Sequence, residues 1–132
     1  MTKTFEFKTR VYYADTDAGG VVYHSTYLDF CEKARTELLR EESIEQSKLK
    51  SEYGIIFVVK SLKIDYRKSA RLDDLLVIRT QIIENTGIVL KMSQEVFNEN
   101  NENIASVMVE IVCLNKDLRA TRIPKEICGV LC

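Results

Sequence analysis

The sequence of 132 residues is poor in the features that mark several large classes of protein. It contains one histidine and four cysteines, and no two cysteines form a C-x-x-C pair. Structural zinc sites need several cysteine and histidine ligands at short spacings, so no such site is expected. The net charge is only -1, which gives no electrostatic attraction to nucleic acid or to an anionic membrane surface.

Long apolar runs are absent as well. No stretch approaches the roughly 20 apolar residues that a membrane-spanning helix needs, and residues 1–10 lack the apolar core of a signal peptide. We therefore expect a cytoplasmic protein without a membrane span. The length suits a single domain, 1–132, and no internal repeat, low-complexity segment or linker divides it.

Three common functional motifs are missing. The chain has no G-x-S-x-G turn of a serine hydrolase, and Ser25 stands directly beside the only histidine. It has no G-x-x-x-x-G-K phosphate loop, and its acidic residues are not spaced like those of a calcium-binding loop. Any catalytic function therefore has to rest on another arrangement of polar residues.

Hydrophobic periodicity predicts one long helix and several antiparallel strands. Alternation of apolar and polar residues predicts a strand over 5–13. Spacings of three and four predict a helix that begins after Ser25 and ends near 40–43. A weaker helical turn is expected just before Gly54. Four further strands are predicted at 55–68, 75–85, 88–98 and 104–115. This order of elements is typical of an α+β fold.

The apolar residues indicate which face of each element is buried. Most polar residues of the helix, Arg35 among them, are expected on the side opposite its apolar stripe, and no catalytic role is assigned to Arg35. Strand 55–68 carries apolar residues on both faces, which suggests a subunit interface on the side away from the helix. The residues expected on one face of this strand are Ile56, Val58, Leu62, Ile64 and Tyr66.

The stretch 11–40 is the most informative, because a turn with two aspartates and two glycines leads into the helix. N–H groups at a helix start lack intrahelical partners and can bind a developing negative oxygen. Asp17 can attack an acyl carbon or activate a water, and His24 can orient either group or donate a proton. Ser25 is expected to cap the helix through its hydroxyl. A thioester suits such a site, because its thiolate leaves with little acid assistance.

Each of these residues also has a purely structural interpretation. Asp-x-Asp before glycine is common in ordinary loops, where the carboxylates accept hydrogen bonds from nearby backbone N–H groups. Asp15 suits that role better than Asp17 does. A single histidine near a helix start is often structural. Four aromatic residues can line a pocket or lie in the core: Tyr12, Tyr13, Tyr23 and Tyr27.

The motif Asp15-x-Asp17-x-x-Gly20-x-x-x-His24, followed by an aromatic helix with Glu32 and Arg35, resembles the hotdog-fold acyl-CoA thioesterases. It is most similar to the 4-hydroxybenzoyl-CoA thioesterase class, and within that class to the YbgC type associated with the bacterial Tol–Pal system. The segments 64–66 and 70–75 also fit, so the resemblance covers nearly the whole chain.

This resemblance implies a hotdog fold, in which one long helix is wrapped by a curved antiparallel sheet of five to six strands. It implies a homo-oligomer, a dimer of dimers, with the site between subunits and with no cofactor or metal. Asp17 matches the catalytic carboxylate, as nucleophile or general base. His24 matches the position where a backbone N–H polarises the thioester carbonyl, and Tyr13 completes the expected catalytic group. The expected substrate-binding residues are Asp15, Gly20, Ser25 and Tyr27.

The chain departs from the hydroxybenzoyl enzymes in one respect. Those enzymes grip the nucleotide phosphates of CoA with a basic cluster after the third long strand, and the matching stretch here, 84–88, has none. The candidate replacements are Lys60, Lys63, Arg67, Lys68, Arg71 and Lys91. An aliphatic acyl-CoA is the expected substrate, and an acyl-carrier-protein donor stays open. Two other functions also stay open: a non-catalytic partner that binds acyl groups or acyl-carrier protein in envelope or phospholipid metabolism, and a hydratase, which the motif fits poorly.

Overall fold

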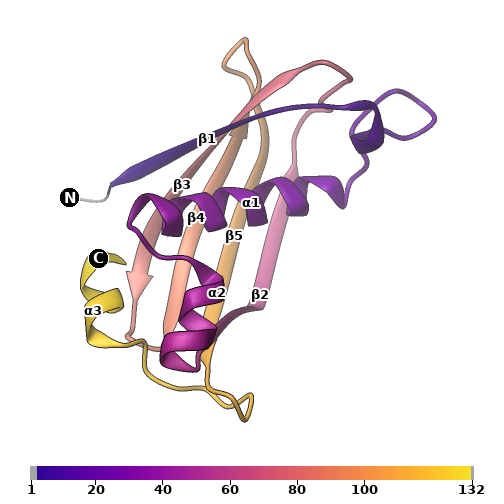
Figure 1. The fold of residues 1–132 in the computed structure, drawn as a ribbon. Coiled ribbons are helices and arrows are strands. Elements are labelled where there is room, and N and C mark those ends of the chain that lie inside the picture. The colour runs from indigo at the N-terminus through magenta and orange to yellow at the C-terminus, as the bar shows by residue number, and fades with distance from the viewer. Residues whose placement is uncertain (1–2, 132) are drawn as a thin grey trace.

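A computed structural model describes residues 3–131 and shows one antiparallel sheet wrapped around one long helix (Figure 1). The helix α1 spans Thr26–Glu41. The sheet has the order β1-β3-β4-β5-β2, which confirms the α+β layout with five strands. The strands are β1 (Thr4–Arg10), β2 (Ile56–Tyr66), β3 (Leu75–Asn85), β4 (Val89–Phe97) and β5 (Asn103–Leu114).

Short helical elements cover the ends of the sheet. The short helix α2 (Gln46–Lys48) continues into a π-helical turn at Leu49–Tyr53. The turn ends at Gly54, whose φ of 66° favours glycine. The predicted weak helical segment and its end are thus confirmed. Near the C-terminus, α3 (Lys125–Cys128) precedes a 3-10 turn at Gly129–Leu131. Within residues 3–131, none of the helices has the length and apolar character that crossing a membrane requires.

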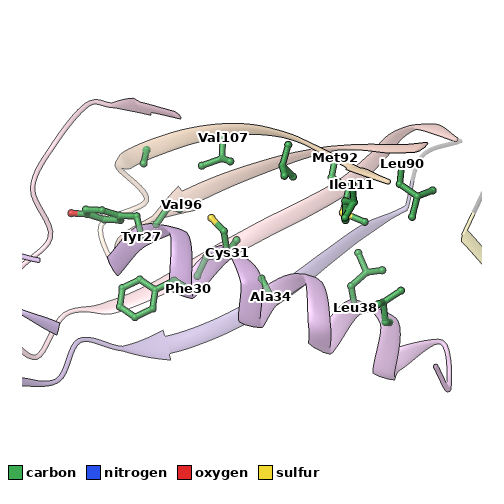
Figure 2. Packing of buried hydrophobic residues seen from close by; sticks show 14 of the residues in the cluster. Tyr27, Phe30, Cys31, Ala34, Leu38, Leu90, Met92, Val96, Val107 and Ile111 are labelled. Atoms are coloured by element: carbon green, nitrogen blue, oxygen red, sulfur yellow. The ribbon is translucent and has the colours of Figure 1, made fainter. Parts of the chain in front are cut away.

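The core lies between α1 and the concave face of the sheet (Figure 2). Every second residue of β5 from Ala105 to Cys113 is buried there, as its alternation predicts. The predicted stripe of α1 is confirmed, because all its members are buried: Tyr27, Phe30, Cys31, Ala34, Leu38 and Leu39. Burial of this stripe is the main contribution to holding the helix on the sheet.

The first strand is shorter than predicted. β1 ends at Arg10, and residues Tyr13–Asp15 form a 3-10 turn instead of extended backbone. The cause is local, because the Asp15 carboxylate accepts a hydrogen bond from the Tyr12 N–H at 2.8 Å and closes the turn. Alternation of side chains continues through 11–13, so periodicity alone could not detect this end.

The predicted face of β2 is wrong in its first half. A β-bulge interrupts the register with β5 between Val59 and Ser61, and a bulge inserts one extra residue that reverses the alternation. Phe57 pairs with Cys113 and Val59 pairs with Ile111, so both lie on the helix side with Leu62, Ile64 and Tyr66. Ile56 and Val58 therefore lie on the outer face. The start of β2 still carries apolar residues on both faces, as expected.

A buried polar network crosses the core and corrects the position of Arg35. This arginine is only 8% exposed, although its neighbours suggested a solvent-facing side. Its Nη1 donates to Gln94 Oε1 at 3.0 Å. Gln94 Nε2 donates to the Cys31 carbonyl at 2.9 Å and to Thr80 Oγ1 at 3.0 Å. The network ties α1 to β4 and β3, and burial lowers the pKa of Arg35.

We predict that Gln94→Met lowers the free energy of unfolding by about 2–4 kcal/mol, because it removes the acceptor of a buried guanidinium at nearly constant volume. Gln81→Met is the matched control. Gln81 bonds Thr4 at 2.8 Å on the outer face, and its loss should change stability by less than about 0.5 kcal/mol. Urea unfolding monitored by circular dichroism measures both. Equal effects of the two substitutions would contradict the role given to the buried network.

Cys31 and Cys113 are free thiols in the part of the chain that the structure describes. Cys31 and Cys113 are buried and Cys128 is half-buried; Cys132 lies outside the described residues. Burial raises the pKa of the Cys31 thiol to about 12, and Arg35 opposes this shift only in part. Since a thiol reacts as its thiolate, Cys31 is protected twice, by inaccessibility and by protonation.

We predict that Cys31 stays unlabelled by a thiol reagent in the folded protein at pH 9, where an ordinary thiol is half ionised. Peptide mass spectrometry should find it labelled after denaturation. Ionisation of the Cys31 thiol is unfavourable in the folded state. Its contribution to the free energy of unfolding is therefore fully present below the ordinary pKa of 9 and is lost as the pH rises towards about 12. Rapid labelling of native Cys31 would show that α1 opens readily from the sheet.

Candidate active site

Two antiparallel bridges hold the loop that carries the two aspartates. Residues Thr16 and Val22 form an antiparallel bridge that closes the loop between them. Val21 forms a second bridge with Arg71, and the Val22 N–H donates to the Ala70 carbonyl at 2.9 Å. The loop is thereby fixed to the connection between β2 and β3, which lies about 50 residues further along the chain.

Asp17 lies in this loop with its side chain exposed and one carboxylate oxygen occupied. Its Oδ1 accepts hydrogen bonds from the N–H groups of Gly19 at 2.8 Å and Val21 at 3.4 Å. A Cβ on Gly19 would lie 3.2 Å from Oδ1, and Gly20 has a φ of 80°. The carboxylate therefore has the backbone bonds of an ordinary Asp turn, and Oδ2 is the oxygen through which it can attack an electrophile or accept a proton.

Asp15 has a structural role in the turn. Its Oδ2 accepts the Tyr12 N–H, and its carbonyl accepts the Tyr23 N–H at 3.0 Å. These two bonds bring the ends of the loop together, so the expectation that Asp15 forms the turn is confirmed. A contact between Asp15 and substrate stays a prediction.

The helix start is organised by two tyrosines. Tyr66 donates its hydroxyl to the His24 carbonyl at 2.8 Å. Tyr27 is 3% exposed, accepts the Ala70 N–H at 3.0 Å and packs edge-on against Tyr66 at a ring distance of 5.6 Å. Burial raises the pKa of the Tyr27 hydroxyl. Tyr27 thus packs in the core and also lines the site. The hydrogen bonds of Tyr27 and Tyr66 fix the backbone that precedes α1.

His24 and Ser25 stand at the N-terminus of α1. The exposed His24 ring contacts the Tyr23 ring at 4.3 Å between centroids. Ser25 occupies the cap position, but the prediction that its hydroxyl caps the helix is wrong, because its side chain makes no such bond. Its φ of -77° and ψ of -16° are already helical, whereas a capping side chain needs extended backbone to reach the first-turn N–H groups.

Three of the four tyrosines near the site lie on the surface. Tyr13 is 81% exposed, Tyr12 66% and Tyr23 48%, so the alternative that they belong to the core is wrong for these three. The Tyr13 side chain stands out from the fold, while its carbonyl accepts bonds from the Thr16 N–H and hydroxyl. Exposed aromatic side chains beside a candidate site are typical of a surface that another molecule covers.

A groove opens beside the helix start, with a volume of about 330 Å³. It brings together two predicted site residues, His24 and Tyr27, with the end of β2 and the segment that follows it; the lining residues are Val22, His24, Tyr27, Tyr66, Arg67, Lys68 and Ser69. Tyr66 and Ser69 were not among the predicted site residues. The sequence did contain a signal for this segment, because the basic run 67–71 directly follows a strand that ends in an aromatic residue. The residues of this run do not, however, indicate that it contacts residues 22–27.

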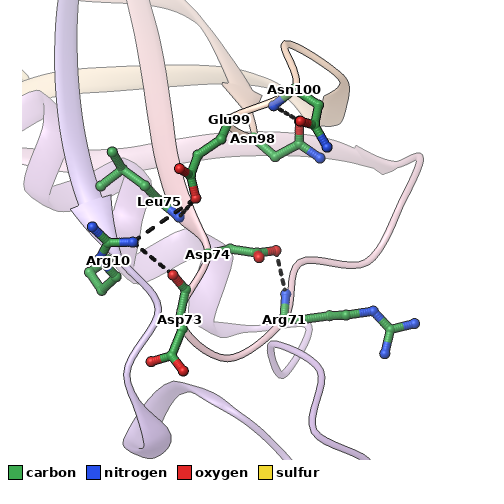
Figure 3. Close-up of polar contacts among 8 residues, drawn as sticks. All are labelled: Arg10, Arg71, Asp73, Asp74, Leu75, Asn98, Glu99 and Asn100. Atoms are coloured by element: carbon green, nitrogen blue, oxygen red, sulfur yellow. Dashed lines mark hydrogen bonds and ion pairs between the residues drawn. The ribbon is translucent and has the colours of Figure 1, made fainter.

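The connection between β2 and β3 is itself a tight, hydrogen-bonded turn (Figure 3). The Arg71 N–H donates to Asp74 Oδ2 at 2.9 Å, and Arg10 Nη1 donates to the Asp73 carbonyl at 2.8 Å. Asp73 has a φ of 73°, a conformation that Asp tolerates better than most residues. The turn therefore offers a firm support to the Asp17 loop that is bonded to it.

Comparison with known proteins identifies the family. The Thioesterase-like superfamily matches residues 11–131. The acyl-CoA thioesterase YbgC of Haemophilus influenzae is 43% identical, over 93% of this chain and 90% of its own. The acyl-CoA thioester hydrolase YbgC of Escherichia coli is 41% identical, over 96% of this chain and 94% of its own.

A solved structure agrees with these relatives. The crystal structure of a probable thioesterase from Bartonella henselae is 35% identical and has a TM-score of 0.88, covering 92% of this chain and all of that one. The family match over residues 11–131 includes the loop that carries Asp17, α1 and strands β2 to β5. The chain therefore belongs to the thioesterase-like superfamily, has the hotdog fold and is a relative of the YbgC thioesterases.

Proposed function

We propose that this protein hydrolyses the thioester bond of aliphatic acyl-CoA molecules to a free acid and CoA, with Asp17 as the catalytic carboxylate. The relatives in H. influenzae and E. coli carry the names acyl-CoA thioesterase and acyl-CoA thioester hydrolase. The single observation that carries the assignment of the residue is the loop itself. It presents the exposed Asp17 carboxylate on a backbone that closes onto the residues before α1.

The proposed reaction uses the helix start and the carboxylate together. The thioester carbonyl lies against backbone N–H groups at the start of α1, which stabilise the negative charge that develops on its oxygen. Asp17 Oδ2 either attacks the carbonyl carbon, giving an anhydride that water then opens, or takes a proton from a water that attacks instead. In both cases the carbon–sulfur bond breaks, the thiolate leaves, and water supplies the new oxygen of the acid. His24 orients the reacting groups.

An aliphatic tail has apolar surface available beside α1. A second cavity of about 110 Å³ lies between the helix and the sheet, around Arg35, which is ten residues after Ser25. At 1.5 Å per helical residue, that position is about 15 Å from the helix start. Most of its lining is apolar: Leu39, Phe57, Val59, Leu90, Met92 and Ile111, with Glu32 and Gln46 at its polar side.

The active assembly proposed is a homo-oligomer, a dimer of dimers, with each site completed by a second copy. β2 is an edge strand of 11 residues that pairs only with β5 in the sheet order. Long unpaired edges are normally covered in native proteins. Val59 and Tyr66, both 48% exposed, lie on β2, and the exposed tyrosines 12, 13 and 23 lie near the helix start. A second copy of the chain would cover both sets.

We predict that Asp17→Asn folds normally and lowers turnover by about 10²–10⁴-fold, because the amide neither attacks nor takes up a proton. Asp117→Asn, in an exposed loop at the other end of the sheet, makes the same chemical change and should leave turnover unaltered. Thiol release from short, long and aromatic acyl-CoA esters measures both variants and ranks substrates. Full turnover by Asp17→Asn would remove Asp17 from the mechanism, and a preference for aromatic esters would overturn the aliphatic assignment.

We predict that sedimentation velocity finds the protein as a dimer or tetramer at the micromolar concentrations of an activity assay. The physical reason is the combined exposure of the β2 edge and the aromatic side chains near the site. A fully active monomer would show that one subunit holds a complete site, and would overturn the proposed assembly without affecting the assignment of Asp17.

A further inference from the structure

The segment 67–71, of sequence Arg-Lys-Ser-Ala-Arg, lies beside the candidate site, and its residues 67–69 line the groove at the helix start. It is bonded to the site at several points. Ala70 accepts the Val22 N–H at 2.9 Å and donates to the Tyr27 hydroxyl at 3.0 Å. Arg71 bridges Val21 in the Asp17 loop. Three cationic side chains are therefore carried on a backbone that is fixed to both the Asp17 loop and the helix start.

Two of the three cations, Arg67 and Arg71, make no direct ion pair, although the Ser106 hydroxyl beside Arg67 in turn donates to Glu95. Lys68 forms an ion pair with Glu102. Arg67 Nε donates to Ser106 Oγ at 3.2 Å, but a hydroxyl does not neutralise a guanidinium. The Arg71 guanidinium points away from the carboxylates of Asp73 and Asp74 (Figure 3). Across residues 3–131, neither Arg67 nor Arg71 has an acidic partner within 4.0 Å. Both side chains are exposed, so an anion can reach them.

We propose that Arg67 and Arg71 bind the phosphate groups of the CoA carrier while the pantetheine arm lies in the groove beside the helix start. This inference rests on the proposed function and names the residues that hold its substrate. Guanidinium groups match phosphate oxygens in a two-pronged geometry and stay charged at every physiological pH. The groove at the helix start, which Arg67 helps to line, also contains Tyr27, Tyr66 and Ser69, which offer apolar surface and hydroxyl groups to an amide-containing arm.

The alternative location for phosphate binding is poor in this chain. The turn after β3 has the sequence Glu84-Asn85-Thr86-Gly87-Ile88 and contains no cation. Within one subunit it also lies at the other end of β3 from the 67–71 segment. The 11 residues of β3 span about 33 Å at 3.3 Å per residue. The segment 67–71, in contrast, is bonded directly to the Asp17 loop through Ala70 and Arg71.

The test compares three esters of one acyl group that differ only in the carrier: CoA, 4′-phosphopantetheine and pantetheine. We expect Arg67→Gln and Arg71→Gln each to lower kcat/KM for the CoA ester about tenfold, and to leave the pantetheine ester unaffected. Arg119→Gln removes the same charge from an exposed loop at the far end of the sheet and should alter neither. The 4′-phosphopantetheine ester tells whether the contact is to the phosphate that CoA shares with acyl-carrier protein or to the phosphates of the nucleotide.

The outcomes separate this inference from the proposed function. Equal losses on all three esters would assign the arginines a structural role and overturn the inference, as would unchanged kinetics on the CoA ester. If the wild-type protein hydrolyses none of the esters, the proposed function fails instead. Calorimetric binding of free CoA then still tests the arginines, because tighter binding to wild type than to Arg67→Gln and Arg71→Gln supports phosphate recognition, and equal binding overturns it.

Discussion

The position of the candidate site depends on the contact between α1 and the concave face of the sheet. Burial of the apolar stripe supplies most of the free energy of this contact, but apolar contact has no direction and would tolerate sliding of the helix along the sheet. The Gln94 amide supplies the direction, because it bonds both the Arg35 guanidinium and the Cys31 carbonyl. A buried polar group must keep its partners, so one helix position is selected.

Hydrogen bonds connect the fixed start of α1 to the loops at the surface. Tyr27 and Tyr66 connect the helix start to the end of β2 and to Ala70, and Ala70 holds the Asp17 loop through Val22. The functional groups therefore stand on fixed backbone although their side chains are exposed. A carboxylate in such a place is accessible to substrate and to water, which both proposed roles of Asp17 require.

The surroundings of the helix start differ in chemistry on its two sides. Along α1 towards Arg35, the neighbouring cavity is mostly apolar, whereas the segment 67–71 presents cationic side chains to solvent. An acyl-CoA molecule has the same division, with an apolar tail on one side of the thioester and phosphates on the other. In the proposed oligomer, a second subunit would complete this surface at the exposed β2 edge and at the projecting Tyr13.

The local sequence pattern was sufficient to predict the long helix and the strands, and to identify the residues of the Asp17 loop. The helix, the hairpin of β3 and β4, and the alternation of β5 follow from periodicity, because apolar spacing reflects which face an element buries. The turn and its aspartates were identifiable because Asp and Gly act on backbone only a few residues away.

What the tertiary structure alone decided depends on contacts between residues far apart in the chain. The bulge in β2 comes from pairing with β5, and the burial of Arg35 comes from a glutamine 59 residues away. The helical backbone at Ser25 reversed a local prediction because the segment before α1 is held by Tyr66. The placement of the segment 67–71 beside the Asp17 loop likewise required the pairing of residues 21–22 with 70–71. Periodicity carries no information on such pairings, since they are selected by the packing of the whole chain.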